Sequence, residues 1–226
     1  MCSRYFLDAD GNVIAYTFNV TENTAVRRRY NIAPTQEAPV VRVGAGGARE
    51  LAMLRWGLVP SWAKELGVGT KMINARSEGV EAKPAFRAAV RSRRCLVPAT
   101  GFYEWKGLPG RKQPYAITIA RPLFAFAGLW ETWAPQGARP VETFTILTTD
   151  ANPAIASVHD RMPVILPREA EEAWLTGDAK DALALLAPYA GDTKLRPVGP
   201  AVGSSKNETP ECLDDAPGWS DQPSLF

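Results

Sequence analysis

Apolar and polar residues alternate in short runs along most of the chain, which is typical of β-strands with one buried face. These runs predict strands at residues 4–7, 13–18, 40–43, 51–56, 96–98, 115–119, 123–129 and 143–148. Helical spacing of apolar residues is clearest at residues 83–93, 168–174 and 178–186. The pattern therefore predicts an α+β fold, namely a single domain built on a curved, largely antiparallel β-sheet or barrel with flanking helices.

The chain has 226 residues, a length that fits one large domain. We expect this domain to span residues 2–202, after removal of Met1. From Gly203 onward the sequence is rich in Gly, Ser, Asn, Pro and acidic residues, a composition that buries little apolar surface. Residues 203–226 are therefore predicted to form a disordered acidic tail.

Composition excludes several classes of protein. Hydrophobic residues make up 46% of the chain and charged residues 22%, values that exclude wholesale disorder and fibrous structure. The longest apolar stretch, residues 123–130, is far shorter than the about 18 residues expected of a membrane helix. No apolar signal segment follows the first residues. The three cysteines are too scattered for a disulfide framework or a zinc cluster, so we expect a cytoplasmic protein.

Charge is distributed unevenly although the formal net charge is only +2. Residues 1–120 carry 18 Lys and Arg against 9 Asp and Glu, which gives +9, while the remaining residues carry 8 against 15, which gives −7. Such asymmetry indicates either a polyanionic partner for one face or two halves that attract each other within one fold.

Cys2 is the first candidate for chemistry. Initiator methionine is generally removed before a small second residue, which would leave an α-amine and a thiol on the same cysteine. Their ordinary pKa values are about 7.7 to 8.0 and about 8.5. Such a 1,2-aminothiol condenses with an aldehyde to an imine, and the neighbouring sulfur then closes a thiazolidine ring with the advantage of an intramolecular reaction. The alternative is that Cys2 is simply the second residue of the gene product.

Three further side chains are candidates for catalysis. The amide of Asn74 could position a nucleophile or an oxyanion, or it could be an ordinary turn residue. Glu104 stands between aromatic residues, which favours a raised pKa and proton transfer, although a pair with Lys106 is an equal alternative. The only histidine, His159, could transfer a proton at cellular pH or be structural. We do not pair it with Asp160, because adjacent side chains on an extended segment point apart.

A cation follows each of these four residues by two positions. The pairs are Cys2 and Arg4, Asn74 and Arg76, Glu104 and Lys106, and His159 and Arg161. On an extended backbone, residues i and i+2 share a face, so each strand would present a reactive group and a positive charge together. This arrangement suits chemistry beside a phosphodiester backbone, whereas each pair taken alone could be a solvated strand edge.

Aromatic residues accompany the positive charge near Trp56 and Trp62. Aromatic side chains among basic residues are typical of single-stranded nucleic acid binding, where bases stack on them. Tryptophan is also a common core residue, and we expect at least one of the two to be buried. The basic run at residues 27–29 could extend a phosphate track or form a solvated face.

Six sequence blocks together resemble the SRAP family, the SOS response-associated peptidase domain proteins, also called abasic site processing proteins. The blocks are residues 1–4 (MCSR), 30–36 (YNIAPTQ), 55–63 (RWGLVPSWA), 72–77 (MINARS), 98–106 (PATGFYEWK) and 147–163 (LTTDANPAIASVHDRMP). The resemblance covers roughly residues 2–190 in order. It implies the SRAP fold and a role in the DNA damage response at the nucleoid.

The resemblance implies that Cys2 captures the ring-opened aldehyde of an abasic site in single-stranded DNA as a thiazolidine crosslink, shielding the strand from cleavage. Asn74 would position the cysteine and the sugar, Glu104 would act as general acid and base, and His159 would assist ring opening and proton transfer at the imine. The residues implied to hold DNA phosphates are Arg4, Arg76 and Arg161. No metal and no organic cofactor is implied, and a monomer suffices.

Two other functions stay open at this point. One is a thiol-dependent peptidase or amidohydrolase that removes Met1 autocatalytically, and the other is a noncatalytic module that binds single-stranded DNA, including its junctions with duplex. The last five residues, QPSLF, also resemble the short peptide with which bacterial repair proteins dock on the sliding clamp. Gln222, Leu225 and Phe226 would make that contact, unless this terminus is ordinary disordered chain.

Overall fold

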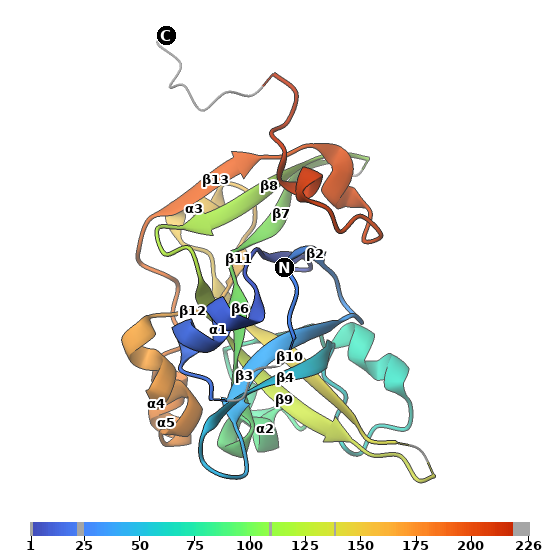
Figure 1. Ribbon diagram of the computed structural model, residues 1–226, viewed down its shortest axis with the longest axis vertical. Coiled ribbons are helices and arrows are strands. Elements are labelled where there is room, and N and C mark those ends of the chain that lie inside the picture. Colours follow the sequence, from blue (N-terminus) through green and yellow to red (C-terminus); the bar gives the residue numbers. More distant parts are fainter. Residues whose placement is uncertain (1, 22–24, 109, 138, 219–226) are drawn as a thin grey trace.

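Five strands close into a β-barrel in the computed structural model, which describes residues 2–21, 25–108, 110–137 and 139–218 (Figure 1). They are β3 (Glu37–Val43), β4 (Arg49–Trp56), β6 (Arg94–Ala99), β9 (Phe124–Trp133) and β10 (Val141–Asp150). Each strand pairs with the next around the ring, and only the β4–β10 pair among them is parallel. The predicted α+β fold with a largely antiparallel sheet or barrel is confirmed.

Three short strands extend the barrel at β9 and β10. β5 (Asn74–Arg76) runs parallel to β10, β11 (Arg161–Pro163) runs antiparallel to it, and β12 (Ile165–Leu166) pairs with β9. The register places Asn74 opposite Ile146 and Arg161 opposite Asp150. Strand β10 therefore brings together two motifs that are more than eighty residues apart in the sequence.

A second sheet of five antiparallel strands is stacked beside the barrel (Figure 1). Its order is β13 (Thr193–Pro197), β8 (Arg111–Ile119), β7 (Gly101–Leu108), β1 (Tyr5–Leu7) and β2 (Arg29–Ile32). Tyr5 of β1 packs edge-on against Trp56 and Phe126 of the barrel, with ring centroids 5.3 and 5.9 Å apart. These contacts hold the start of the chain between the two sheets.

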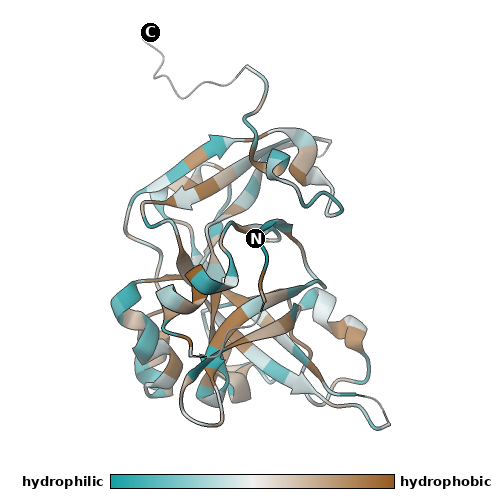
Figure 2. Cartoon of the chain, in the orientation of Figure 1, coloured by the Kyte–Doolittle hydropathy of each residue, from teal (hydrophilic) through white to brown (hydrophobic). Residues whose placement is uncertain are grey.

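Short helices flank the sheets. They are α1 (Gly11–Phe18), α2 (Arg87–Ser92), α3 (Pro153–Ala156), α4 (Glu171–Thr176) and α5 (Ala179–Ala184), with 3₁₀ turns η1 (Leu66–Lys71), η2 (Val80–Ala82), η3 (Arg168–Ala170), η4 (Pro200–Gly203) and η5 (Pro210–Leu213). Figure 2 shows hydrophobic residues concentrated along the barrel strands, with hydrophilic residues prominent on α4 and α5. Among the described residues, none of the helices is long and apolar enough to cross a membrane.

The strand predicted at residues 13–18 is wrong, because this segment is helix α1. The Asp10 side chain accepts hydrogen bonds from two main-chain N–H groups of the first turn, and Asn19 ends the helix in the left-handed region at φ 53°. Ile14 and Phe18, one turn apart, are both buried. A short, mostly apolar run such as residues 13–18 fits both the helical and the strand period. Here the N-cap residue Asp10 favours the helix.

The prediction of a disordered tail from residue 203 is also wrong for residues 203–218, which the structure places against β1 and β2. We call residues 199–215 the C-terminal strap; it is drawn in red in Figure 1. The side-chain amide of Asn31 donates to the carbonyl oxygens of Val202, Ser204 and Asn207 at 3.3, 2.9 and 2.9 Å. Cys212 of the strap is fully buried. The polar composition did not predict this order because main-chain carbonyls make part of the attachment, beside a small apolar cluster that includes Val202 and Cys212.

Candidate active site

Cys2 lies fully buried just before β1, where three elements meet. Its carbonyl oxygen accepts a 2.7 Å hydrogen bond from the side-chain amide of Asn74. Its thiol lies 3.6 Å from the carbonyl oxygen of Arg4 and donates to it. Asn74 reaches this point because β5 pairs with β10 and turns alternate side chains toward the start of the chain. The structure thus joins two of the residues predicted to be catalytic.

Glu104, the third predicted catalytic residue, is only 4% exposed on strand β7. Burial raises the pKa of its carboxyl above the ordinary value, while the positive charge that His159 can carry opposes this shift. Burial also raises the pKa of the Cys2 thiol, and the negative charge of Glu104 adds to that increase. The thiol is therefore held neutral at physiological pH, beside a carboxyl group whose proton affinity is also increased.

His159 follows helix α3 in a turn, and its side chain is 25% exposed. Its Nδ1 accepts a 2.9 Å hydrogen bond from the main-chain N–H of Arg161 and lies 2.8 Å from Oδ1 of Asp160. The prediction that the His159 and Asp160 side chains point apart is wrong, because the segment is a turn rather than an extended strand. When Nδ1 is protonated it can donate to Asp160, and when it is not it accepts from the main chain, so the ring is held in both states.

Two of the four predicted catalytic residues, Glu104 and His159, line an open, polar cavity of about 380 Å³. Its lining residues are Ser3, Arg4, Glu104, Trp105, Lys112, His159 and Gly203. Cys2 and Asn74 lie directly next to this lining, through the neighbouring Ser3 and the Asn74–Cys2 hydrogen bond. Within the described residues, no group of three or more His, Cys, Asp or Glu side chains is placed to hold a metal ion.

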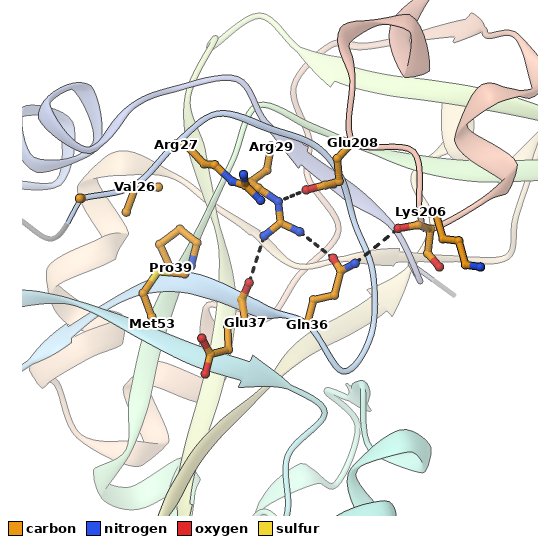
Figure 3. Close-up of a pocket in the computed structure, with 11 residues that line it drawn as sticks. Val26, Arg27, Arg29, Gln36, Glu37, Pro39, Met53, Lys206 and Glu208 are labelled. Atoms are coloured by element: carbon orange, nitrogen blue, oxygen red, sulfur yellow. Dashed lines mark hydrogen bonds and ion pairs between the residues drawn. The ribbon is translucent and has the colours of Figure 1, made fainter.

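A larger groove of about 1020 Å³ lies on the other side of the strap, away from the predicted catalytic residues (Figure 3). Arg29 at its centre is held by Glu208, by the Gln36 side chain and by the carbonyl oxygen of Glu37. Arg27 and Lys206 stand at its edge. None of the four predicted catalytic residues lines this groove.

Two of the three arginines predicted to bind phosphate are engaged inside the protein. Arg161 is 9% exposed and donates to both oxygens of Glu78, to Asp150 and to the carbonyl oxygen of Thr148. Arg4 donates to Asn31 and to the carbonyl oxygen of Val202, both at 3.0 Å. Arg161 thus holds the turn after α3, and Arg4 holds the strap. The predicted phosphate role therefore does not fit Arg161 and fits Arg4 only in part.

Of the other residues predicted to contact DNA, one is buried and two are exposed to solvent. Trp56 is fully buried, and its indole N–H donates a hydrogen bond of 2.7 Å to the carbonyl oxygen of Ile73. The base-stacking role predicted for Trp56 is therefore wrong. Trp62 is 64% exposed, and Arg76 is exposed at the end of β5. Gln222, Leu225 and Phe226, predicted to contact a sliding clamp, lie outside the described residues.

Sequence reasoning missed three residues of this region. Trp105 and Lys112 line the cavity but lie on paired strands whose register the sequence does not reveal. Asn31 belongs to the quoted block at residues 30–36, yet its burial gives it a role that no local pattern indicated. A fully buried asparagine is unusual, and its contacts become visible only in three dimensions.

The closed barrel and the sheet beside it thus hold a buried Cys2 whose main chain is bonded by the Asn74 amide, while Glu104 and His159 line one cavity. The chain belongs to the family described as SOS response associated peptidase (SRAP), whose model matches residues 1–205. It is 41% identical over 223 residues to the abasic site processing protein YoqW of Bacillus subtilis, covering 95% of this chain and 99% of that protein.

More distant relatives give the same picture. The abasic site processing protein HMCES of Gallus gallus is 35% identical over 222 residues, which cover 83% of this chain and 66% of that protein. A crystal structure of a protein from Bacteroides thetaiotaomicron matches with a TM-score of 0.85 at 26% identity, covering 95% of this chain and all of that one. The fold and the arrangement of its sheets are therefore shared with that structure.

Proposed function

We propose that this protein processes abasic sites in single-stranded DNA by capturing the ring-opened sugar aldehyde on Cys2 as a thiazolidine crosslink. Two relatives are named for abasic site processing. The observation that carries the proposal is the hydrogen bond from the Asn74 amide to Cys2, together with the nearby Glu104 carboxyl, which lines one cavity with His159. The proposal requires removal of Met1, which frees the amine of Cys2.

The reaction balances without any external oxidant or cofactor. The Cys2 nitrogen forms a C–N bond to the aldehyde carbon, and the carbonyl oxygen leaves as water, which gives an imine. The Cys2 sulfur then forms a C–S bond to the same carbon while the C=N electron pair moves to nitrogen. Nitrogen finally takes up the proton that the thiol releases. Removal of the imine prevents β-elimination and so protects the strand.

Glu104 and His159 divide the proton transfers. Because burial keeps the Cys2 thiol protonated, the sulfur needs a base at the moment of attack, and the nearby Glu104 carboxylate takes that proton and returns it to nitrogen. His159 lines the same cavity and, with Nδ1 held, assists opening of the cyclic sugar. Asn74 fixes the Cys2 main chain and thereby aligns its amine and thiol with one carbon atom.

One cavity-lining side chain and two exposed ones would hold the DNA strand. Trp105 lines the cavity, and Trp62 presents most of its indole to solvent. A base stacked on an exposed tryptophan gains about 1 to 3 kcal/mol. Arg76 adds a solvent-exposed cation next to Asn74. We further propose that the protein acts in the response to DNA damage.

The experiment is incubation with single-stranded DNA that contains uracil and has been treated with uracil glycosylase. We expect a heat-stable adduct on a denaturing gel, and an intact mass equal to the protein without Met1 plus the DNA minus one water. Cys2→Ala should form no stable adduct. Cys2→Ser keeps the amine but lacks sulfur, so it should give strand cleavage in place of the adduct. Full retention of Met1 in an adduct-forming sample would refute the mechanism.

Autocatalytic removal of Met1 is a second candidate function of the same groups. It is favoured by the proximity of the Glu104 carboxyl and the Cys2 thiol, and by the peptidase in the family's description. Synthesis in a purified translation system without methionine aminopeptidase separates the two functions. Loss of Met1 from the wild type but not from Glu104→Gln would support self-processing, whereas retention of Met1 in both would exclude it.

A further inference from the structure

We propose that Lys112 binds the DNA phosphate adjacent to the abasic sugar, a kind of contact that the family resemblance implied for Arg4, Arg76 and Arg161. The inference rests on the proposed function, because it concerns the strand that enters the same cavity. Lys112 was not among the cations that follow the predicted catalytic residues by two positions.

The first step is that Arg161 has little capacity left for a phosphate, and that part of the Arg4 guanidinium is already engaged. Arg161 is almost completely buried, and it donates to two carboxylates and a carbonyl oxygen. The partner carboxylates of Glu78 and Asp150 are 55% and 79% exposed, so a phosphate would have to displace them from a guanidinium that is itself turned inward. Arg4 holds Asn31 and the strap with the same nitrogen, Nη1. A phosphate that engaged these guanidinium groups would have to compete with the contacts that shape the cavity.

The second step is the position of Lys112. It lies on β8 opposite Gly107 of β7 and lines the cavity together with Glu104 and His159. β1 pairs with β7 only at Gly101 and Phe102, and β13 pairs with β8 from Tyr115 onward. The ends of β7 and β8 therefore continue as a two-stranded ribbon beyond the flanking strands (Figure 1). The ribbon carries Lys112 at the edge of the cavity, on the path of DNA that enters it.

The third step is the freedom of the Lys112 ammonium group. Its side chain is exposed, and it forms no salt bridge with any residue that the structure describes. Lysine is a compact charge on a flexible four-carbon stem, so it can follow a phosphate as the sugar moves during ring opening. The same charge offsets the repulsion between that phosphate and the Glu104 carboxylate, which shares the cavity.

The test measures binding rather than crosslinking. The probe is a short single-stranded oligonucleotide with a tetrahydrofuran site, an abasic analogue that has no aldehyde. Each phosphate neutralised on a single strand contributes a slope of about −0.7 to the plot of log K against log [salt]. Lys112→Ala should lower the magnitude of the wild-type slope by about 0.7 and weaken binding about fourfold at 0.15 M salt. Lys112→Arg should restore both.

Lys180→Ala is the matched control, since Lys180 is an exposed lysine on helix α5, outside the cavity lining. It should retain the wild-type slope. If the slopes of Lys112→Ala and the wild type agree, the inference is overturned even though the wild type still crosslinks abasic DNA. If the wild type neither binds this probe nor crosslinks abasic DNA, the proposed function itself fails. Equal losses in Lys112→Ala and Lys180→Ala would also overturn the inference, because they would indicate a general charge effect.

Discussion

The side-chain amide of Asn74 donates a 2.7 Å hydrogen bond to the carbonyl oxygen of Cys2, and this bond connects an added strand of the barrel to the start of the chain. Strand β5 contributes only three residues, yet its parallel pairing with β10 fixes where the amide points. Packing buries Cys2 completely, but packing alone does not fix the direction of its main chain. The bond therefore supplies orientation that the local sequence around Cys2 cannot provide.

Replacing Asn74 tests this orientation. Asn74→Ala removes the donor, and a reacting group displaced by about 1 Å loses roughly a hundredfold in rate. We expect the single-turnover rate of adduct formation to fall by about ten- to a hundredfold, with little change in DNA affinity. Rapid-quench measurement of the adduct checks this. A wild-type rate in Asn74→Ala would show that the hydrogen bond is merely structural.

Replacing Glu104 should separate activity from stability. Its folded-state pKa is raised by burial, so the carboxyl stabilises the fold most below its unfolded pKa and loses that contribution as pH rises through the folded value. At pH 7 the buried carboxylate is therefore a cost that Glu104→Gln removes. We expect an unchanged or higher Tm at pH 7 and a crosslinking rate about a hundredfold lower.

The pH dependence gives an independent check on Glu104. In the wild type, the rate should fall as pH drops through the raised pKa, because the protonated carboxyl can no longer accept the thiol proton. Glu104→Gln should lose this acidic limb and retain only the pH dependence of the other groups. Identical pH profiles for the two proteins would contradict the role of Glu104 as the base.

Arg161 and Arg76 form a contrasting pair. Arg161→Ala removes a buried guanidinium that joins Glu78, Asp150 and a carbonyl oxygen, so the free energy of unfolding should fall by about 2 to 4 kcal/mol. Arg76→Ala alters an exposed side chain, so stability should stay within about 0.5 kcal/mol while DNA affinity falls. Urea unfolding and salt-dependent DNA binding of both variants check this. The reverse outcome would restore Arg161 as a phosphate contact.

The sequence allowed most barrel strands to be predicted. Alternation over residues 51–56 reflects one face turned to the core, whereas residues 96–98 and 143–148 are buried at every position, as strands of a closed barrel can be. The rule that residues i and i+2 share a face also holds where the backbone is extended, as for Asn74 and Arg76. It fails at His159, where a turn follows α3. Local patterns cannot anticipate that turn, nor the strand register that places Lys112 in the cavity.

The C-terminal strap shows a different limit of sequence reasoning. Its polar composition predicts disorder, yet the strap forms part of the cavity wall at Gly203 and binds β2 through Asn31. The acceptors are carbonyl oxygens, which every residue possesses. A buried amide can therefore help to order a segment that carries few apolar side chains, and composition does not record such contacts.

Asn31 should consequently control both the strap and the cavity. The residue is fully buried, and Asn31→Ala leaves three carbonyl oxygens and the Arg4 guanidinium without this partner. Each unsatisfied buried group costs about 1 to 3 kcal/mol. We expect hydrogen exchange over residues 199–215 to accelerate while the barrel strands stay protected, and the crosslinking rate to fall because Arg4 and the cavity wall shift.

The control for Asn31 is Asn207→Ala, which removes an exposed donor to the carbonyl oxygen of Ala201 within the strap itself. It should loosen only the strap's own turn and leave the attachment to β2 intact. Because Asn31 is buried, Asn31→Asp provides a second variant that keeps the acceptor for Arg4 but turns a carboxylate oxygen toward the three carbonyls. Exchange should then accelerate in Asn31→Asp as in Asn31→Ala. If the strap stays protected in both, its order depends on Cys212 and the surrounding packing rather than on the asparagine.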